Sequence, residues 1–119
     1  MTRRTTLLLA AQTILFAAAS LVHAGVLASG YEHSRASISE GVIATVLFAG
    51  LVVSVARPGA TRTVALVTQG FALLGTLVGA FTIAIGVGPQ TTADTLFHVL
   101  LLALLLTGLA VTWKSKRET

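Results

Sequence analysis

Four long runs of apolar residues, separated by short polar or glycine-containing segments, make up most of the chain. A helix needs about 20 apolar residues to cross about 30 Å of membrane hydrocarbon. Each run is close to this length or longer. The runs are apolar on every side, as is typical of helices surrounded by lipid. The pattern therefore predicts four transmembrane helices, at residues 5–28, 38–56, 63–87 and 92–113.

The connections between the predicted helices are short. Residues 57–60 have the sequence of a tight turn with proline and glycine at its centre, and residues 86–90 contain further helix breakers. Only residues 29–37 are numerous enough for a small polar loop. Short connections join antiparallel neighbours. We therefore expect an all-α, up-down-up-down four-helix bundle that forms a single transmembrane domain over residues 1–119.

Basic residues lie almost entirely at one set of predicted helix ends, and Arg35 alone lies at the other. The residues on the shared side are Arg3, Arg4, Arg57, Arg62, Lys114, Lys116 and Arg117. Cytoplasmic loops carry the excess of lysine and arginine in multi-pass proteins, so we expect both termini in the cytoplasm of a cell, with the chain in its cytoplasmic membrane, as in a bacterium. The first apolar run is long enough to span, which favours a retained helix over a cleaved signal peptide.

The composition agrees with a membrane location and excludes several other classes of protein. The chain has 55% hydrophobic and only 10% charged residues, whereas a soluble domain has about 25% charged residues. The net charge of +4 does not require nucleic acid as a partner, because anionic lipid headgroups attract basic residues beside a membrane. Cysteine is absent, which excludes disulfides, thiolate metal sites and cysteine nucleophiles.

Small residues at four-residue steps indicate how the helices pack. Gly75 and Gly79 form a Gly-x-x-x-Gly pair in the third predicted helix, and Ser20 and Ala24 have the same spacing in the first. Such pairs let helices approach closely within a membrane. We expect them to form contacts within the bundle. Self-association, or membership of a larger membrane complex, is the alternative.

Four ionisable side chains lie near the predicted outer ends of the helices: His23, Glu40, Asp94 and His98. Ionisable groups at membrane depth face the bundle interior and often mark function. His23 lies about five residues from the end of the first predicted helix, and His98 lies about as far into the fourth. At about 1.5 Å per residue, the two imidazoles are expected at similar depth.

Each acidic residue also has a purely structural interpretation. Ser37 and Glu40 have the spacing of a capping box, in which the first residue caps a helix and the second reaches back to its amide. Thr91 and Asp94 have the same spacing before the fourth predicted helix. Such capping satisfies the free backbone amides of a first helical turn. Both acids could therefore serve the helix starts alone.

The same residues could instead hold a ligand. His23, His98 and Glu40 would supply two nitrogens and an oxygen to a zinc, copper or iron ion. Asp94 would orient His98 or serve as a fourth ligand. His23 and His98 could also be the axial ligands of a haem. A site for a small ligand or for protons, at the same end of the bundle, is a further alternative.

No motif in the chain indicates a reaction, and no catalytic residue is predicted. The sequence favours a small non-enzymatic membrane protein, an accessory or structural four-helix subunit. The alternative is a metal-, haem- or small-ligand-binding protein with its site at the outer end, which could be coupled to protons. The two interpretations differ in whether the four ionisable residues bind a ligand or only hold helices together.

Overall fold

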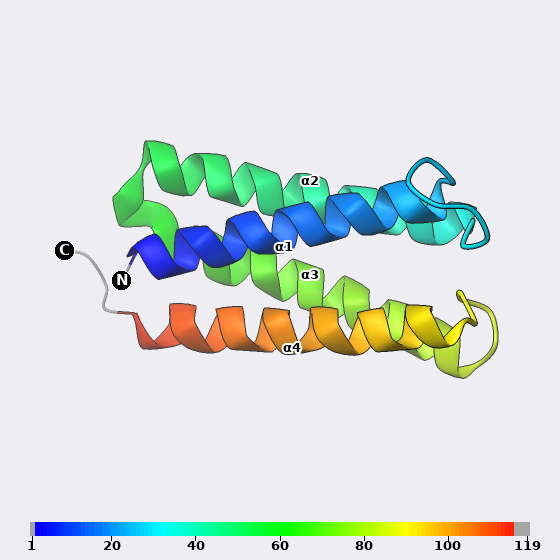
Figure 1. The fold of residues 1–119 in the computed structure, drawn as a ribbon. Coiled ribbons are helices and arrows are strands. Elements are labelled where there is room, and N and C mark those ends of the chain that lie inside the picture. The colour runs from blue at the N-terminus through cyan, green and yellow to red at the C-terminus, as the bar shows by residue number, and fades with distance from the viewer. Residues whose placement is uncertain (1, 116–119) are drawn as a thin grey trace.

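The computed structural model describes residues 2–115 of the chain, which form four long helices. They are α1 (Thr2–His23), α2 (Ser34–Ala56), α3 (Thr61–Ala84) and α4 (Thr92–Lys114), with the short 3-10 helix η1 (Pro58–Ala60) between α2 and α3 (Figure 1). No strand is present in this part of the chain. The prediction of an all-α chain with four long helices is therefore confirmed.

All four helices are long and apolar enough to cross a membrane. At about 1.5 Å per residue, helices of 22 to 24 residues are longer than the roughly 30 Å of hydrocarbon in a bilayer. Only 28% to 33% of the most apolar part of each helix is buried within the bundle. The remaining apolar surface suits contact with lipid, which is compatible with a multi-pass membrane protein.

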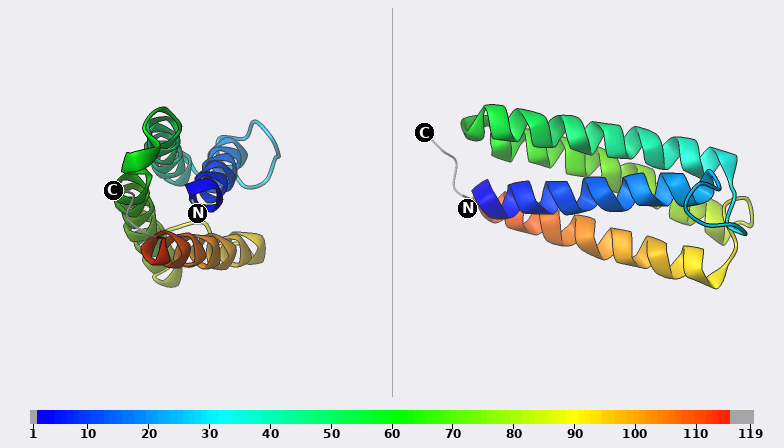
Figure 2. Two further views of the ribbon diagram at one scale, coloured as in Figure 1. Left: turned by 90° about the vertical axis from the view of Figure 1, so that its left-hand side faces the viewer. Right: turned by 45° about the horizontal axis from the view of Figure 1, so that its top comes forward.

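Consecutive helices run in opposite directions and pack as a bundle (Figure 1). Both α1 and α3 pack against α2 and α4, so that α2 and α4 lie diagonally opposite each other (Figure 2). Buried apolar side chains from all four helices fill the centre. They are Leu9, Phe16, Ile43, Ala44, Leu47, Ala65, Ala72, Leu101 and Leu105.

The two ends of the bundle differ in charge. At one end α1 and α3 begin and α2 and α4 finish (Figure 1), and we call this the basic end. It carries Arg3, Arg4, Arg57, Arg62 and Lys114. Lys116 and Arg117, which were predicted to lie on the same side, fall outside the described residues. The opposite end carries His23, His33 and His98, and we call it the histidine end.

Two helices end earlier than predicted because a glycine follows each of them. α1 ends at His23 rather than at residue 28. Gly25 then has a φ of +82°, in the left-handed region that terminates helices and favours glycine. α3 ends at Ala84 rather than at residue 87, ahead of Gly86, which also has a φ of +82°. The apolar character of the residues beyond these glycines concealed both ends in the sequence.

The second helix begins four residues earlier than predicted, at Ser34. Its N-cap is His33, whose ring Nδ1 accepts a hydrogen bond from the backbone N–H of Ala36 at 3.1 Å. The prediction that Ser37 and Glu40 form the capping box was therefore wrong. The Ser37 hydroxyl donates instead to a backbone carbonyl of α1 at 2.8 Å, which leaves Glu40 to face the interior of the bundle.

Glycines in α3 allow close packing between helices of the same chain. A Cβ atom at Gly75 would lie 2.9 Å from Cδ1 of Ile43 in α2. A Cβ atom at Gly79 would lie 3.1 Å from Nε2 of His98 in α4. Larger residues at these positions would push the neighbouring helices away. The Gly-x-x-x-Gly pair therefore forms contacts within the bundle, as expected.

A neutral polar cluster is buried between the middle of the bundle and its basic end. The side-chain amide of Gln12 donates to Oε1 of Gln69 at 2.9 Å, and the amide of Gln69 donates to Oγ1 of Thr112 at 2.9 Å. All three side chains are fully buried. Gly108 leaves room for them, since a Cβ atom there would overlap both glutamine side chains. This glutamine cluster joins α1, α3 and α4.

Candidate functional site

Three ionisable side chains from three helices meet at the histidine end. Nδ1 of His23, the last residue of α1, lies 2.5 Å from Oε1 of Glu40 in α2. Nε2 of the same ring lies 2.8 Å from Oδ1 of Asp94 in α4. The side chains of all three residues are at most 9% exposed. We call this arrangement the carboxylate–imidazole triad.

Helix ends place two members of the triad. The backbone carbonyl of His23, where α1 stops, accepts a hydrogen bond from the N–H of His33 at 2.8 Å, which ties the following loop to the helix end. Thr91 is the N-cap of α4 and accepts from the backbone N–H of Asp94 at 3.1 Å. Its hydroxyl donates to Oδ2 of Asp94 at 2.5 Å. The predicted capping by Thr91 is thus present, and it orients Asp94 toward His23.

The two hydrogen bonds of the triad need two protons, and with these two protons the triad has a single net negative charge. Both ring nitrogens of His23 lie within hydrogen-bond distance of a carboxylate oxygen, and each of these bonds needs one proton. An imidazolium between two carboxylates contains the same number of protons as a neutral imidazole beside one carboxylic acid. The triad is therefore anionic in either form. Removing a proton would break one of its two hydrogen bonds.

His98 lies apart from the triad, so the expectation that the two imidazoles share one depth was wrong. α1 ends at His23, and this places His23 level with Asp94 rather than with His98, one turn further along α4. Nδ1 of His98 lies 3.0 Å from the backbone carbonyl of Asp94. A carbonyl oxygen only accepts, so Nδ1 donates this hydrogen bond; in the neutral ring, Nε2 then has a free lone pair.

The metal and haem sites predicted from the sequence are not assembled in this geometry. Within residues 2–115, no three histidine, aspartate or glutamate side chains are arranged to hold one metal ion. His23 already bonds a carboxylate through each ring nitrogen, so it has no free nitrogen for a metal or a haem iron. Glu40 and Asp94 are its partners, while His98 faces a cavity beside α3.

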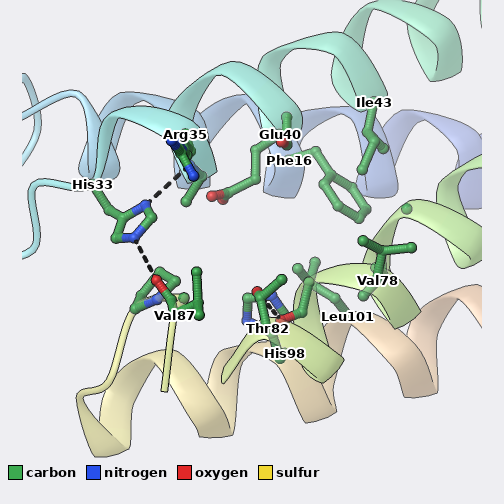
Figure 3. Close-up of a pocket in the computed structure, with 17 residues that line it drawn as sticks. Phe16, His33, Arg35, Glu40, Ile43, Val78, Thr82, Val87, His98 and Leu101 are labelled. Atoms are coloured by element: carbon green, nitrogen blue, oxygen red, sulfur yellow. Dashed lines mark hydrogen bonds between the residues drawn. The ribbon is translucent and has the colours of Figure 1, made fainter. Parts of the chain in front are cut away.

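A cavity of about 250 Å³ lies at the histidine end, among α2, α3 and α4 (Figure 3). Its apolar walls include Phe16, Ile43 and Leu101, and its polar lining includes Glu40 and His98. Pockets for drug-sized ligands are about 300 to 1,000 Å³. The cavity is therefore sized for a smaller molecule with both apolar and polar parts.

Two hydrogen-bond acceptors in the cavity wall have no partner among the described residues. Oε2 of Glu40 is buried without a hydrogen bond, and Figure 3 shows this carboxylate directed from α2 into the cavity. Nε2 of His98, whose side chain is half-buried, also lacks one, since the ring bonds only through Nδ1. A buried acceptor such as Oε2 of Glu40 costs about 1–3 kcal/mol when it has no partner, and more when it is charged. A molecule that donates hydrogen bonds inside the cavity would remove this cost.

His33 and Arg35 lie on the polar side of the cavity toward the loops (Figure 3). Nε2 of His33 lies 3.4 Å from the carbonyl oxygen of Val87, in the connection between α3 and α4. His33 thus links the start of α2 to that connection. Arg35 is exposed at this edge, and within residues 2–115 no carboxylate forms an ion pair with it.

A second cavity, of about 340 Å³, lies on the other side of the triad between α1 and α4. Its lining is almost wholly apolar and includes Leu15 and Phe97, with His23 and Asp94 at its edge. The triad therefore lies between an almost wholly apolar cavity and the mixed polar and apolar cavity that Glu40 lines. Glu40, at one end of the hydrogen-bonded triad, lines the first cavity, and Asp94, at the other end, lines the second.

The structure thus brings together His23, Glu40 and Asp94 from the predicted set and leaves His98 in the adjoining cavity wall. Sequence reasoning assigned no binding role to His33 or Arg35. For Arg35 a signal was available, because it is the one basic residue on the outer side of the predicted bundle. For His33 the signal was its place directly before the actual start of α2, which was not recognised.

Comparison of the chain with protein-family models, with curated proteins and with solved structures finds no match. A function is therefore inferred from the geometry of the described residues. Two features indicate it: the triad that joins three helices, and the neighbouring cavity into which an unpartnered carboxylate oxygen points.

Proposed function

We propose that this protein is a multi-pass membrane protein with its basic end in the cytoplasm, and that its histidine-end cavity binds a small organic cation. The observation that carries the proposal is the buried Oε2 of Glu40, which belongs to a residue lining the cavity and has no hydrogen-bond partner. The ligand would fill the cavity from the outer face of the membrane. The proposed role is recognition of a ligand, and no covalent chemistry is part of it.

The distribution of charged and aromatic residues supports the orientation. Basic residues gather at one end of the bundle, as they do on the cytoplasmic side of multi-pass proteins. The guanidinium of Arg62 lies 5.0 Å from the ring centroid of Trp113 at this end, and it donates to the backbone carbonyl of Trp113 at 3.2 Å. Tryptophan is enriched where a membrane meets water, so this pair fits the cytoplasmic interface.

The charge of the site supports a cation as the ligand. The triad carries a net negative charge, and the two free atoms in the cavity wall, on Glu40 and His98, are both acceptors. An ammonium group has a positive charge and several N–H donors, so it complements both features. A cation beside Oε2 also favours the ionised form of Glu40, so that the proton between Glu40 and His23 moves toward the imidazole on binding and stays within the triad.

Titration calorimetry of the full chain in detergent micelles, with n-propylammonium as the probe, tests this function. We expect saturable binding that weakens about 10- to 100-fold in Glu40→Gln, because the lost charge-assisted hydrogen bond is worth about 1.5–3 kcal/mol. Glu32→Gln is the matched control, since it removes the same charge from an exposed residue outside the cavity lining. Lack of binding, or equal loss in both variants, would contradict the proposal.

Buffers with different ionisation enthalpies test whether the triad keeps its two protons on binding. The measured heat depends on the buffer only if protons are released or taken up. Because the proton between Glu40 and His23 can move to the imidazole without leaving the triad, we expect a heat that does not depend on the buffer. A buffer-dependent heat would show that the triad exchanges a proton with solvent on binding, but it would leave the binding site in place.

Labelling of single cysteines tests the orientation, because the natural chain has no cysteine. Ser29 lies in the exposed loop at the histidine end, and Gly59 lies in the exposed turn at the basic end. A membrane-impermeant maleimide added to intact cells should label Ser29→Cys and leave Gly59→Cys unlabelled until the cells are opened. The reverse pattern would place the cavity on the cytoplasmic side.

A purely structural role is the second candidate function. It is favoured by the fact that both ring nitrogens of His23 are already occupied by side chains from two other helices. Such a triad would fix the register of the helices in an accessory subunit. In that case n-propylammonium does not bind to the natural chain, although replacing His23 still destabilises it.

A further inference from the structure

The cavity that would take the cation also has a positive charge at its edge. Arg35 lines the same cavity as Glu40, five residues earlier on α2 and closer to the loops (Figure 3). Five helical residues correspond to a rise of about 7.5 Å. The cavity lining therefore contains a negative group in its depth and a positive group at its edge, about one small molecule apart.

Each of the two residues has an unpaired group within the described part of the chain. Oε2 of Glu40 has no hydrogen-bond partner although the side chain is only 9% exposed. Arg35 forms no ion pair with a carboxylate of residues 2–115. The two acids nearest to it along the chain are both engaged elsewhere: Glu40 binds His23, and Glu32 accepts from the backbone N–H of Gly30 at 3.1 Å. A ligand with both kinds of charge would satisfy both residues at once.

We infer that the ligand is a small zwitterion, with an ammonium group and a carboxylate joined by a short carbon chain. This inference rests on the proposed cation site and adds the anionic half of the ligand. The ammonium would donate to Oε2 of Glu40 and Nε2 of His98, the two acceptors without partners. The carboxylate would lie toward Arg35, whose planar guanidinium suits a carboxylate through paired hydrogen bonds.

The cavity also has apolar lining that suits the carbon chain of such a molecule. Ala36 lies between Arg35 and Glu40 along α2, and Val87 and Pro89 line the cavity from the connection between α3 and α4. Phe16, Ile43 and Leu101 line its deeper part, beyond Glu40 and His98 (Figure 3). A simple anion would lack a partner for the negative charge of Glu40. A simple cation would leave Arg35 unpaired at the edge. The zwitterion complements the whole lining.

Ligands that lack one of the two charged groups test the ammonium and carboxylate parts of the inference separately. Replacing the carboxylate of 4-aminobutanoate by hydrogen gives n-propylammonium, and replacing its ammonium by hydrogen gives butanoate. Calorimetry of the natural full chain should show 4-aminobutanoate, or its shorter homologues 3-aminopropanoate and glycine, binding about three- to tenfold more tightly than n-propylammonium. The gain is modest because Arg35 is exposed to solvent. Butanoate should bind more weakly than either.

Substitution of Arg35 identifies the source of that preference. Arg35→Gln should lower the affinity for the amino acid to that for n-propylammonium and leave n-propylammonium binding unchanged or tighter. Glu40→Gln should weaken both ligands. Arg57→Gln, which removes the same charge from an exposed residue at the basic end, should change neither affinity.

The outcomes distinguish failure of the inference from failure of the proposed function. If n-propylammonium binds through Glu40 but none of the three amino acids binds more tightly, or if their advantage survives Arg35→Gln, the zwitterion is wrong and the cation site stands. If neither n-propylammonium nor any of the amino acids binds to the natural chain, both are wrong.

Discussion

The bundle contains two buried polar groups that each join three helices, but they differ in charge and in surroundings. The glutamine cluster of Gln12, Gln69 and Thr112 is neutral and lies under Gly108, where not even a Cβ atom would fit. The carboxylate–imidazole triad is ionisable and adjoins a cavity of about 250 Å³. Close packing surrounds the glutamine cluster, whereas a cavity adjoins the triad on one side.

The glutamine cluster and the triad also differ in the buried atom that each leaves without a hydrogen-bond partner. Oε1 of Gln12 is also buried without a partner, but Gln12 lines neither of the two cavities, and an unpaired neutral amide costs less than an unpaired charge. Oε2 of Glu40 is charged when ionised and belongs to a residue that lines a cavity. We therefore interpret the glutamine cluster as fixing helix register and the triad as preparing a binding site. Four predictions test this division.

Replacing His23 should have the largest effect on stability. In His23→Ala the carboxyl groups of Glu40 and Asp94 lose the ring that both of them bond, and removal of one partner from a buried ionic contact costs about 3–5 kcal/mol. Unfolding of the purified protein by SDS, followed by circular dichroism, measures the loss. We expect a much smaller cost for the same change in a Glu40→Gln/Asp94→Asn background, where no buried carboxylate remains. Equal costs in both backgrounds would mean that His23 acts by packing alone.

Gly108→Ala should destabilise the glutamine cluster without affecting ligand binding. The added methyl group would overlap the amide groups of Gln12 and Gln69, and overpacking of this kind costs about 1–3 kcal/mol. Gly70→Ala in α3 is the matched control, because a Cβ atom there meets no other atom within 4 Å. SDS unfolding should separate the two variants clearly. If they are equally stable, the cluster is more loosely packed than the structure indicates.

The main helices could be predicted from the sequence because their signal is strong and local. Each span has about 20 apolar residues. In lipid only helices and closed β-barrels satisfy the backbone, and continuous apolar runs of this length favour helices. The ends could not be predicted as well. Gly25 terminates α1 through its backbone conformation, and the residues after it stay apolar as far as Ala28. His33 caps α2 with an imidazole nitrogen, whereas the usual capping residues are serine, threonine, aspartate and asparagine.

The candidate site could be predicted as a group of residues but not as a geometry. The antiparallel order of the helices places His23, Glu40 and Asp94 at one end, which the positions of the apolar runs already implied. Which of these side chains form hydrogen bonds depends on where α1 ends. The predicted end lay five residues too late, which placed His23 about 7.5 Å too deep along the helix axis. The prediction therefore put His98, rather than Asp94, at the level of His23. Gln12 gave no comparable signal, since a lone glutamine in an apolar run has no motif around it.

Gln69→Leu tests whether the glutamine cluster contributes only to stability. The change removes the hydrogen bonds to Gln12, to Thr112 and to the backbone carbonyl of Ala65. Because hydrogen bonds between helices in membranes average about 0.6 kcal/mol each, we expect a loss of about 1–2 kcal/mol in SDS unfolding. The affinity for n-propylammonium should stay the same. A loss of affinity matching that of Glu40→Gln would show that the two polar groups are coupled along the bundle.

Thr91→Ala should have the smallest effect on stability of the four substitutions. It tests whether the N-cap of α4 helps to hold Asp94 in the triad. Thr91 accepts from the backbone N–H of Asp94 and donates to its Oδ2, and loss of an N-cap costs about 1 kcal/mol. Thr92→Ala, one residue further on and also exposed, is the control and should change stability by less. Since Thr91 holds Asp94 toward His23, its loss should also increase amide hydrogen exchange at the start of α4 but not around Gln69. Equal exchange in the two variants would mean that His23 alone positions Asp94, and that the triad needs no support from the helix cap.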